Sequence, residues 1–546
     1  MSFVDTFYDN LAAHPDRALL IEVHGEALEP APGSEIAALV ARARGALRTR
    51  GVKPGDRVVL LAPNGVRWAA SDLAILGEGA IVVPMYARQD PAELVEMMHD
   101  CDPRAVIVPG ADLGDAIAAH WPEAPLLPFE ALFAGEPVDE RPRERADDDV
   151  VTIIYTSGST GVPKGVMLTA GNVAHMLPCT ATALERMTGR PAGNDRVFHY
   201  LPFCFAGSRI LLWTCLLRAN PLMVSTDLDD LARELGTARP NYFLNVPVLL
   251  DRIRNGVEAG LADKPAPVRW LYRRGKAAFE RAVQGRAGRR DRLALTLANR
   301  VVFGAIQQRI GPELECLICG SAPLAESTQR WFEMIGIPVY QVYGLTETTA
   351  IVTMDRPAPD DPHAVVPGRV GPAIDGVAIR LSEDGELQTR GPNVFAGYWG
   401  REEATAAAFT EDGWLRSGDR ADVDAAGRYR IIGRMKNLLV PSSGHNVAPE
   451  PLEQRLQSVS GVEQALVVGH GRPFLSAILT GDVDAAALCE AVDALNDDLP
   501  HYRRIRRFHV TSERFTIENG LLTATQKVRR DAIEQHFADP IEEMYR

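Results

Sequence analysis

Hydrophobic and polar positions in the first 350 residues alternate between the period of a helix and that of a strand. Residues 36–48 place apolar side chains three or four positions apart, which predicts an amphipathic helix. A turn and a strand follow in GVKPGDRVVLLAP, and WAASDLAILGEGAIVVPM predicts a helix, a glycine turn and a strand. Further short strands are predicted in RAVIVPG, PNYFLNVP, ELECLICG and GIPVYQVYG. Strands that alternate with helices predict a largely parallel α/β sheet.

The pattern changes beyond residue 370, where short β segments are separated by turns. AIRLSEDGELQTRG and GWLRSGDRADVDAAGRYRIIGR predict a small barrel or meander, and PLEQRLQSVSGVEQALVVGH predicts a helix and then a strand. A chain of 546 residues exceeds what one hydrophobic core can organise. We therefore expect an α/β fold with a large N-terminal domain, residues 1–434, of parallel-sheet layers plus a small β-barrel-like part. Residues 435–546 are expected to form a smaller α+β C-terminal domain.

Composition and charge exclude several classes of protein. Hydrophobic residues make up 46% and charged residues 24% of the chain, which is typical of a folded soluble protein. The net charge of −14 argues against general nucleic-acid binding, no apolar run approaches the ~20 residues of a membrane span, and the N-terminus lacks a signal layout. Seven dispersed cysteines indicate reduced thiols and a cytoplasmic location. Cys316 and Cys319 are expected on opposite faces of a strand, buried, and unable to share a metal.

One segment is basic in an otherwise acidic chain. Residues 268–310 contain eleven Lys or Arg and two acidic residues. Such a cluster is either a patch for an anionic lipid surface or polyphosphate ligand, or an ordinary solvated helical face. The sequence leaves both interpretations open, and with them a peripheral contact with a membrane.

A loop rich in glycine and hydroxyl side chains follows the apolar run VVTIIY. YTSGSTGVPKGV differs from the common phosphate loop, which ends in Gly-Lys-Ser/Thr, because Pro163 precedes its lysine and Gly165 follows it. Backbone amides opened by glycine, together with hydroxyls and one ammonium group, suit a bound phosphate, although a flexible polar turn is the alternative. The candidate phosphate ligands are Thr156, Ser157, Gly158, Ser159, Thr160, Gly161 and Lys164.

Three further segments carry groups that suit nucleotide chemistry. In YGLTETTA, Glu347 follows Thr346 and could hold Mg²⁺, or it could cap a helix. In GWLRSGDR, an exposed carboxylate at Asp419 could accept hydrogen bonds from both hydroxyls of a ribose, with Arg434 beside it, or it could be a plain turn residue. LTATQKVRR places Lys527 in a loop, where a surface lysine without a special role is the alternative.

Taken together, in this order and spacing, the segments indicate one particular superfamily. The chain resembles the adenylate-forming superfamily, which contains acyl- and aryl-CoA synthetases, luciferase-like enzymes and adenylation domains of peptide synthetases. The motifs that carry the resemblance over nearly the whole chain are YTSGSTGVPKG, GSAPL, YGLTE, GELQTRGPNVFAGYW, SGD, GRMKNLLVPSSGHNVAPEPLE and the lysine of LTATQKVRR. Within the superfamily the chain is most similar to long-chain fatty acyl-CoA synthetases, through VPMY, NYFLNVPVLLDRIRNG, VVFGAIQQRIGPELECLICGSAPL and PSSGHNVAPE.

The resemblance implies a first half-reaction in which a fatty carboxylate attacks the α-phosphate of ATP and gives acyl-AMP and pyrophosphate. The glycine-rich loop would hold the β- and γ-phosphates, and Lys527 would stabilise the carboxylate and the α-phosphate together. Glu347, with Thr346 beside it, would hold Mg²⁺ together with Thr156, and Asp419 with Arg434 would hold the ribose. The residues implied to line adenine are Gly320, Ser321, Ala322, Pro323, Gln341, Tyr343 and Gly344.

The resemblance also implies a second half-reaction, in which the thiol of coenzyme A opens the acyl-AMP. Relatives rotate a mobile C-terminal domain about a hinge, here Lys436, which withdraws Lys527 and brings in a glycine turn. Ser443, Gly444 and His445 would then bind coenzyme A, because glycine leaves room for pantetheine close to the backbone. The basic stretch HYRRIRRF would meet the phosphates of coenzyme A, or would be a solvated charge cluster.

One position departs from the pattern of the family. YLPFCFAGSR has Phe205 where relatives often have histidine, and we expect this ring in the acyl pocket, as a gate or as a core residue. The expected function is that of an ATP-dependent fatty acid–CoA ligase acting on a medium- or long-chain acid. A ligase that loads a separate acyl carrier protein, and an adenylate-binding protein without catalysis, are the alternatives.

Overall fold

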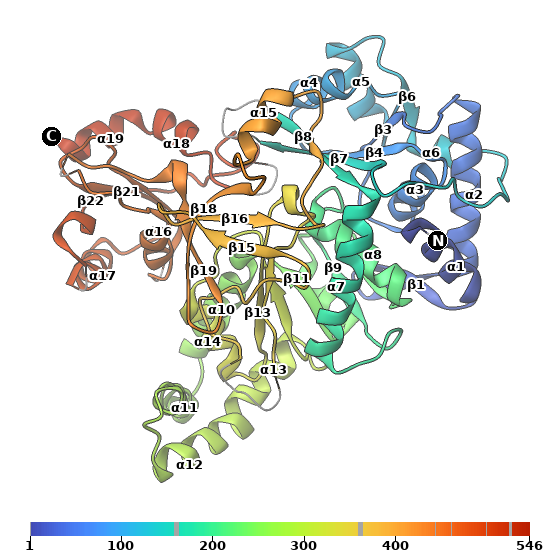
Figure 1. Ribbon diagram of the computed structural model, residues 1–546. Helices are drawn as coiled ribbons and strands as arrows, with labels where there is room; N and C mark the ends of the chain where they lie inside the picture. The colour runs from blue at the N-terminus through green and yellow to red at the C-terminus, as the bar shows by residue number, and fades with distance from the viewer. Residues whose placement is uncertain are drawn as a thin grey trace. The chain divides into compact units, whose positions relative to one another are not determined.

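The computed structural model describes residues 2–157, 163–358, 364–442, 444–459, 461–497, 499–523 and 527–546. The chain divides into two compact units, drawn in Figure 1. The first unit comprises residues 1–378 and 390–413, and the second comprises residues 379–389 and 414–546. The domain boundary expected after Arg434 stays a prediction; in this division the strands immediately before Arg434 belong to the second unit.

The first unit contains a seven-stranded sheet whose inner strands are parallel. Its strands lie in the spatial order β17 (Gly397–Tyr398), β8 (Pro163–Thr169), β7 (Val150–Ser157), β4 (Ile81–Pro84), β3 (Arg57–Leu60), β5 (Ala105–Val108) and β6 (Leu126–Pro128). The pairs from β7 to β6 are parallel, whereas β8 and β17 are antiparallel additions at one edge. The strands predicted in the first 110 residues are therefore confirmed as β3, β4 and β5.

An eight-stranded sheet makes up the rest of the β structure of this unit. Its order is β14 (Thr353–Met354), β13 (Val339–Tyr343), β12 (Leu317–Cys319), β11 (Tyr242–Asn245), β9 (Val197–His199), β10 (Leu222–Ser225), β1 (Ala18–His24) and β2 (Ala27–Pro32). The pairs from β13 to β1 are parallel, and the two edge strands are antiparallel. Along β12 the side chains alternate between two cores, so Cys316 and Cys319 are buried on opposite faces, as predicted.

One hydrophobic core lies between the two sheets. It contains Leu60 and Val82 from the seven-stranded sheet, Leu222 and Tyr242 from the eight-stranded sheet, and apolar side chains of α1, α2, α3, α7 and α8. The helix predicted over residues 36–48 is confirmed as part of α2. The helices of the unit are α1 (Phe3–Ala13), α2 (Gly33–Thr49), α3 (Val66–Gly77), α4 (Pro91–Cys101), α5 (Ala111–His120), α6 (Phe129–Leu132), α7 (Ala170–Thr188), α8 (Ala206–Arg218), α9 (Leu231–Ala238), α10 (Pro247–Ala262), α11 (Ala266–Val283), α12 (Arg289–Ala298), α13 (Gly304–Ile310), α14 (Glu326–Met334) and α15 (Glu402–Ala408).

The second unit contains two smaller sheets. A meander has the order β15 (Ala378–Leu381), β16 (Glu386–Arg390), β18 (Leu415–Val423) and β19 (Tyr429–Arg434), and a second sheet has the order β20 (Val462–Val468), β21 (Leu475–Gly481) and β22 (Ile505–Thr511). Apolar side chains of α16 (Glu450–Gln457) and α17 (Ala485–Asp497) pack on one face of the second sheet. Those of α18 (Arg530–His536) and α19 (Ala538–Tyr545) pack on the other face. The helix and strand predicted after residue 450 are confirmed as α16 and β20. Among the described residues, none of the helices combines the length and the apolar character required to cross a bilayer.

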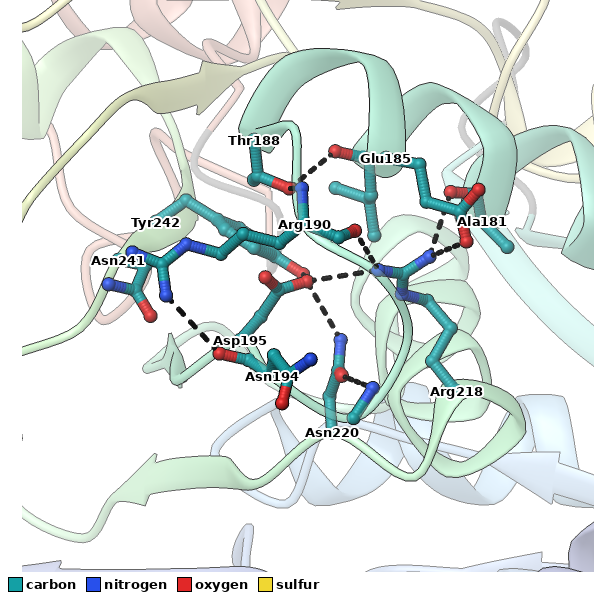
Figure 2. Close-up of polar contacts among 12 residues, drawn as sticks. Ala181, Glu185, Thr188, Arg190, Asn194, Asp195, Arg218, Asn220, Asn241 and Tyr242 are labelled. Carbon is teal, nitrogen blue, oxygen red and sulfur yellow. Dashed lines mark hydrogen bonds and ion pairs between the residues drawn. The ribbon is translucent and has the colours of Figure 1, made fainter.

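A buried ion pair fixes the segments that enter the central strands of the eight-stranded sheet. Figure 2 shows Arg218, at the end of α8, beside Asp195, which precedes β9, with their Nη2 and Oδ2 atoms 3.1 Å apart. Asn220, just before β10, donates to the same oxygen at 3.0 Å, and the hydroxyl of Tyr242 in β11 lies 3.4 Å from it. Burial raises the pKa of Asp195, and the charge of Arg218 opposes this effect. Arg218 also binds the half-exposed Glu185 at 2.8 Å.

Removal of one partner of the buried pair should destabilise the protein strongly. Arg218→Met leaves the carboxylate of Asp195 buried without its cation, and we expect a loss of about 3–5 kcal/mol in the free energy of unfolding. The matched variant Glu185→Gln breaks only the exposed contact of the same guanidinium and should cost about 1 kcal/mol or less. Urea denaturation at neutral pH measures both. Equal costs for the two variants would show that the buried pair does not anchor these strands.

Candidate active site

The predicted phosphate loop connects two antiparallel strands at the edge of the seven-stranded sheet. Thr156 lies directly opposite Lys164, and Ser157 lies opposite Pro163. The predicted ligands Gly158, Ser159, Thr160 and Gly161 lie outside the described residues. The hydroxyl of Tyr155 donates to Asp100 Oδ2 at 2.7 Å, which ties this hairpin to α4.

Lys164 and the predicted metal-binding carboxylate both contact the same tyrosine. The Nζ atom of Lys164 lies 5.1 Å from the centroid of the ring of Tyr398, and the hydroxyl of Tyr398 donates to Glu347 Oε1 at 2.8 Å. Strand β17 carries Tyr398 here because it pairs with β8, with Tyr398 opposite Val166. An ammonium group, an aromatic ring and a carboxylate from three separate stretches of sequence thus meet in one place.

Tight packing around two glycines, Gly165 next to Lys164 and Gly344 near Glu347, fixes the arrangement of these side chains. A Cβ at Gly165 would lie 2.6 Å from Ile153 Cγ2, and one at Gly344 would lie 2.1 Å from the carbonyl oxygen of Ala350. Only glycine allows such close approach. Glu347 sits in a single 3₁₀ turn, Thr346–Thr348, and its carbonyl accepts a hydrogen bond from the amide of Phe395 at 2.9 Å. Thr346 precedes it in the same turn.

The residues predicted to line adenine follow the carboxyl ends of two adjacent parallel strands. Gly320 follows β12, and Tyr343 ends β13 immediately before Gly344. A Cβ at Gly320 would lie 2.7 Å from Val342 Cγ2, so the two strand ends touch there. The next three residues, Ser321, Ala322 and Pro323, are exposed, and Ser321 has a φ of 70°. Carboxyl ends of parallel strands are where α/β proteins usually bind ligands.

Gln341 was also predicted to line adenine, but its side chain lies inside the fold. Its side chain is buried and donates to Gln329 Oε1 at 2.8 Å and to the carbonyl oxygen of Arg369 at 3.1 Å. Its backbone amide donates to Asp355 Oδ2 at 2.7 Å. The structure therefore uses this side chain to hold β13 against α14, and a role towards adenine stays a prediction.

The aromatic residue at the predicted acyl pocket precedes α8. Phe205 is partly buried, and its ring centroid lies 6.1 Å from that of Tyr86, at an angle of 34°. His199, at the end of β9, lies in the same segment and stacks on Phe203 at 5.1 Å. Burial lowers the pKa of His199 to about 3, against a smaller effect of the backbone at Leu201, so this imidazole is neutral at physiological pH.

In the second unit, Asp419 and Arg434 form a cross-strand pair. They lie directly opposite each other on β18 and β19, and Arg434 Nε is 2.9 Å from Asp419 Oδ1. Arg434 also donates to the carbonyl oxygen of Ser417 at 3.2 Å. The expectation of an exposed carboxylate at Asp419 is wrong, because the residue is only 4% exposed and Arg434 covers it. The sequence placed both residues at a ribose; the structure brings them together, and the role towards ribose stays a prediction.

The residues predicted to serve coenzyme A lie after a short 3₁₀ turn, Met435–Asn437, that contains Lys436. Burial, and next the charge of Arg434, lower the pKa of Lys436. Ser443 lies outside the described residues, and Gly444 has a φ of 76° in a turn whose amide donates to Pro441 O at 2.9 Å. The ring of His445 stacks on that of Tyr502, with centroids 4.2 Å apart. This contact places the glycine turn beside the start of HYRRIRRF.

Lys527 lies on the surface of the second unit at the end of a short loop. Its carbonyl accepts from the amide of Thr523 at 2.8 Å, and its own amide donates to the hydroxyl of Thr523 at 3.1 Å. Leu522 and Val528 form an isolated bridge beside them.

A cluster of possible metal ligands exists elsewhere in the first unit. Within the described ranges, the only group of three or more His, Cys or carboxylate donors close enough to share an ion is Glu22, His24 and Glu29 on the β1–β2 hairpin. It includes neither Glu347 nor Thr156. A single carboxylate at Glu347 still suits Mg²⁺, which usually takes one or two protein carboxylates and completes its shell with phosphate oxygens and water.

The sequence did not indicate three aromatic residues that contact predicted site residues. Tyr398 contacts both Lys164 and Glu347, Tyr86 faces Phe205, and Tyr502 stacks on His445. Each lies inside a stretch that carries the resemblance or the basic cluster: GELQTRGPNVFAGYW, VPMY and HYRRIRRF. The sequence shows where these tyrosines stand, but their contacts join segments that are far apart in the chain, and no local pattern predicts such contacts.

The two mixed sheets, the loops at the carboxyl ends of their parallel strands, and the separate smaller unit define an α/β protein. Residues 7–399 match the family of AMP-binding enzymes, and residues 436–546 match the AMP-binding enzyme C-terminal domain. The chain belongs to the AMP-binding enzyme family.

Named relatives and solved structures agree with this assignment. The long-chain-fatty-acid–CoA ligase FadD15 of Mycobacterium bovis is 29% identical over 543 residues, covering 91% of this chain and 89% of the relative. The long-chain-fatty-acid–[acyl-carrier-protein] ligase AEE15 of Arabidopsis thaliana is 24% identical, covering 91% and 80%. ATP-bound MatB from Rhodopseudomonas palustris shares the fold, with a TM-score of 0.74, 23% identity, and 99% and 100% coverage.

Proposed function

We propose that the protein is an ATP-dependent ligase that activates a medium- or long-chain fatty acid as acyl-AMP and transfers the acyl group to coenzyme A. The observation that carries the proposal is the meeting of Lys164, Tyr398 and Glu347 beside the glycine-rich hairpin, in a member of the AMP-binding enzyme family. The name of the mycobacterial relative supports the choice of a fatty acid and coenzyme A.

In the first half-reaction an oxygen of the fatty carboxylate attacks the α-phosphorus of ATP. The bond from that phosphorus to the oxygen bridging to the β-phosphate breaks, and pyrophosphate leaves with the electron pair. An anion attacks an anion, so fixed positive charge and hydrogen-bond donors must stabilise the transition state. Lys164 and the hairpin around it are assigned to the leaving phosphates, and Lys527 to the carboxylate and the α-phosphate.

Glu347 and the hydroxyl of Thr156 would hold Mg²⁺ in this reaction. Bound Mg²⁺ would neutralise phosphate charge and orient the triphosphate. The hydroxyl of Tyr398 fixes one oxygen of Glu347 and thereby the direction in which the carboxylate faces. Thr346 keeps the turn that carries Glu347 in place, as its carbonyl oxygen accepts from the amide of Thr349 at 3.1 Å.

The groups assigned to adenine and to ribose are each held in place by neighbouring residues of their own unit. Adenine is assigned to the segments after β12 and β13, where Gly320 and Gly344 allow close approach of the backbone. Ribose is assigned to Asp419, whose carboxylate is oriented by Arg434. The aromatic side chain of Phe205, with Tyr86 beside it, is assigned to the acyl pocket.

In the second half-reaction the thiol of coenzyme A attacks the carbonyl carbon of acyl-AMP. The C–O bond to the phosphate breaks, AMP leaves, and the thiol proton passes to solvent. Of the atoms described, none would lie within 4 Å of a Cβ added at Gly444, so pantetheine has room beside this backbone. The stacking of His445 on Tyr502 brings the turn next to a basic stretch in which Arg506 and Arg507 are exposed. These arginines suit the phosphates of coenzyme A.

A ligase that loads an acyl carrier protein is the second candidate. The observation that favours it is the similarity to the plant relative named as an acyl-carrier-protein ligase. Adenylation would be the same, and only the acceptor thiol would differ.

An assay of substrates and acceptors tests the proposed function. Purified protein with ATP and Mg²⁺ is given straight-chain acids from short to long, and aromatic acids, with either coenzyme A or a phosphopantetheinylated carrier protein. We expect acyl-CoA formation that is highest with medium- or long-chain acids. Acylation of the carrier alone would favour the second candidate. Absence of pyrophosphate exchange with every acid would contradict both and would leave an adenylate-binding protein without catalysis.

The contact between Tyr398 and Glu347 should control the response to Mg²⁺. Glu347→Gln removes the charge and should lower the rate of pyrophosphate exchange about a hundredfold or more. Tyr398→Phe should lower it about tenfold and raise the Mg²⁺ concentration required, because a hydrogen bond to a charged group is lost. Tyr272→Phe is a matched control, since this tyrosine donates to Glu258 at 2.9 Å outside the site. An unchanged Mg²⁺ response in Tyr398→Phe, or an equal change in the control, would contradict the positioning role.

Variants at Lys527 and Gly444 should separate the two half-reactions. Lys527→Ala should abolish formation of acyl-AMP but leave thioester formation from synthetic acyl-AMP largely intact. Gly444→Trp should do the reverse and accumulate acyl-AMP, because bulk blocks the thiol. Gly444→Ala carries the same backbone strain at positive φ without the bulk, and so serves as the control. Pyrophosphate release and acyl transfer from synthetic acyl-AMP are measured separately for each variant. An equal loss of both reactions in both variants would contradict the proposed division of roles.

A further inference from the structure

Helices α11 and α12 form an arm at the edge of the first unit. Figure 1 shows the two helices packed on each other and extending beyond α13 and α14. A Cβ added at Gly275 would lie 2.5 Å from the Cβ of Ala298, so the helices cross at close range. The basic segment noted in the sequence, residues 268–310, forms most of this arm.

The inner face of the arm is fixed to the body of the unit. Leu271 and Tyr272 of α11 and Phe303, which follows α12, belong to the hydrophobic core on the outer face of the eight-stranded sheet. The hydroxyl of Tyr272 accepts from Trp331 Nε1 of α14 at 2.8 Å and donates to Glu258 of α10. The arm is therefore held in one orientation, with its opposite face outward.

The arm carries large apolar side chains that are exposed to solvent. Leu293, Leu297 and Val301 recur at every fourth position and are 72%, 50% and 50% exposed, and Trp270 on α11 is 64% exposed. Over the described chain ten large hydrophobic residues are exposed, and five of them, the fifth being Val283, lie on these two helices or directly after α12. An apolar stripe turned to solvent is the reverse of what a helix of a globular protein usually shows.

Arginines surround the apolar stripe. Arg289, Arg290 and Arg292 lie at one end of α12, and Arg300 lies next to Val301, all four exposed. Asp291 is turned inward, where it pairs with Arg281 at 2.6 Å, so it does not neutralise this outer set. The arm is strongly basic, although the whole chain has a net charge of −14.

We propose that the outer face of the arm docks on the surface of an anionic lipid bilayer. Trp270, Leu293 and Leu297 enter the boundary between headgroups and acyl chains, and the arginines pair with lipid phosphates. A soluble polyphosphate would use the arginines but would gain nothing from the exposed leucines and tryptophan, whereas a bilayer uses both. The opposite sign of the rest of the chain orients the arm towards the membrane. The contact is peripheral, since it needs no spanning helix.

Vesicle binding by the full chain tests the proposal without ATP, fatty acid or coenzyme A, so its result is separate from that of the proposed function. We expect co-sedimentation with vesicles of phosphatidylglycerol and phosphatidylcholine, weak binding to phosphatidylcholine alone, and loss of binding in high salt. Leu293→Gln with Leu297→Gln should lower the partition coefficient by at least tenfold, because two apolar side chains no longer leave water. Arg289→Gln with Arg290→Gln should lower it about fivefold for each arginine.

Matched controls separate this face from exposed residues in general. Leu28→Gln with Leu228→Gln alters two leucines that are 45% and 43% exposed elsewhere on the unit, and partition should stay as in the wild type. Brominated lipids should quench the fluorescence of the wild type more than that of Trp270→Phe, which reports insertion of that ring. Melting temperatures of all variants show that they are folded.

Three outcomes would overturn the proposal. The first is that the folded wild type does not bind anionic vesicles. The second is that the leucine variants bind as well as the wild type while tripolyphosphate displaces the protein, which would make the arm a polyphosphate site. The third is that the control leucines lower binding as much as those of the arm.

Discussion

The hydrophobic core shared by the two sheets of the first unit is the constraint on which the rest of that unit depends. Both sheets and several helices bury their apolar faces in it, so the position and register of each strand are fixed. Polar groups inside it are tolerated only as paired sets. Asp195 with Arg218 is one such set, and Asp72, which accepts from Trp213 Nε1 at 2.8 Å and pairs with Arg209, is another. The first pair connects α8 to the segment before β9, and the second connects α3 to α8.

The candidate active site follows from that register. With β12 and β13 parallel and in contact, the turns that follow them emerge side by side. With β17 added to the edge of the other sheet next to β8, Tyr398 reaches both Lys164 and Glu347. The glycines at 165 and 344 are required because other segments lie too close for any side chain. Rigid packing thus supplies the preorganisation that the proposed adenylation would require.

Both units carry residues to which the proposed function assigns a role, and the basic arm adds a surface to which it assigns none. The second unit holds Asp419 with Arg434, the glycine turn at Gly444 and Lys527 on separate short segments of one small fold. The arm gives the acidic chain a cationic, partly apolar face. If the protein acts on fatty acids, a contact with lipid would place it where such acids partition.

The sequence by itself determined the local elements and much of the chemistry. Its periodicity located α2, β3, β4, β5 and β12, and alternation along β12 correctly sent Cys316 and Cys319 to opposite cores. The motifs also named Asp419 and Arg434 as candidates for the same ribose. These features depend on neighbours within a few residues or on one hairpin, and a linear pattern records such relations.

Only the tertiary structure decided which distant groups meet. It buried Asp419, turned the side chain of Gln341 to Gln329, joined Tyr398 to Glu347, and stacked His445 on Tyr502. It also showed that Leu293, Leu297 and Val301 face solvent, which their apolar character alone would not suggest. Each of these outcomes depends on pairing between strands or packing between helices that are far apart in the chain. Such pairing is set by the total burial of the fold, and no short stretch of sequence contains that information.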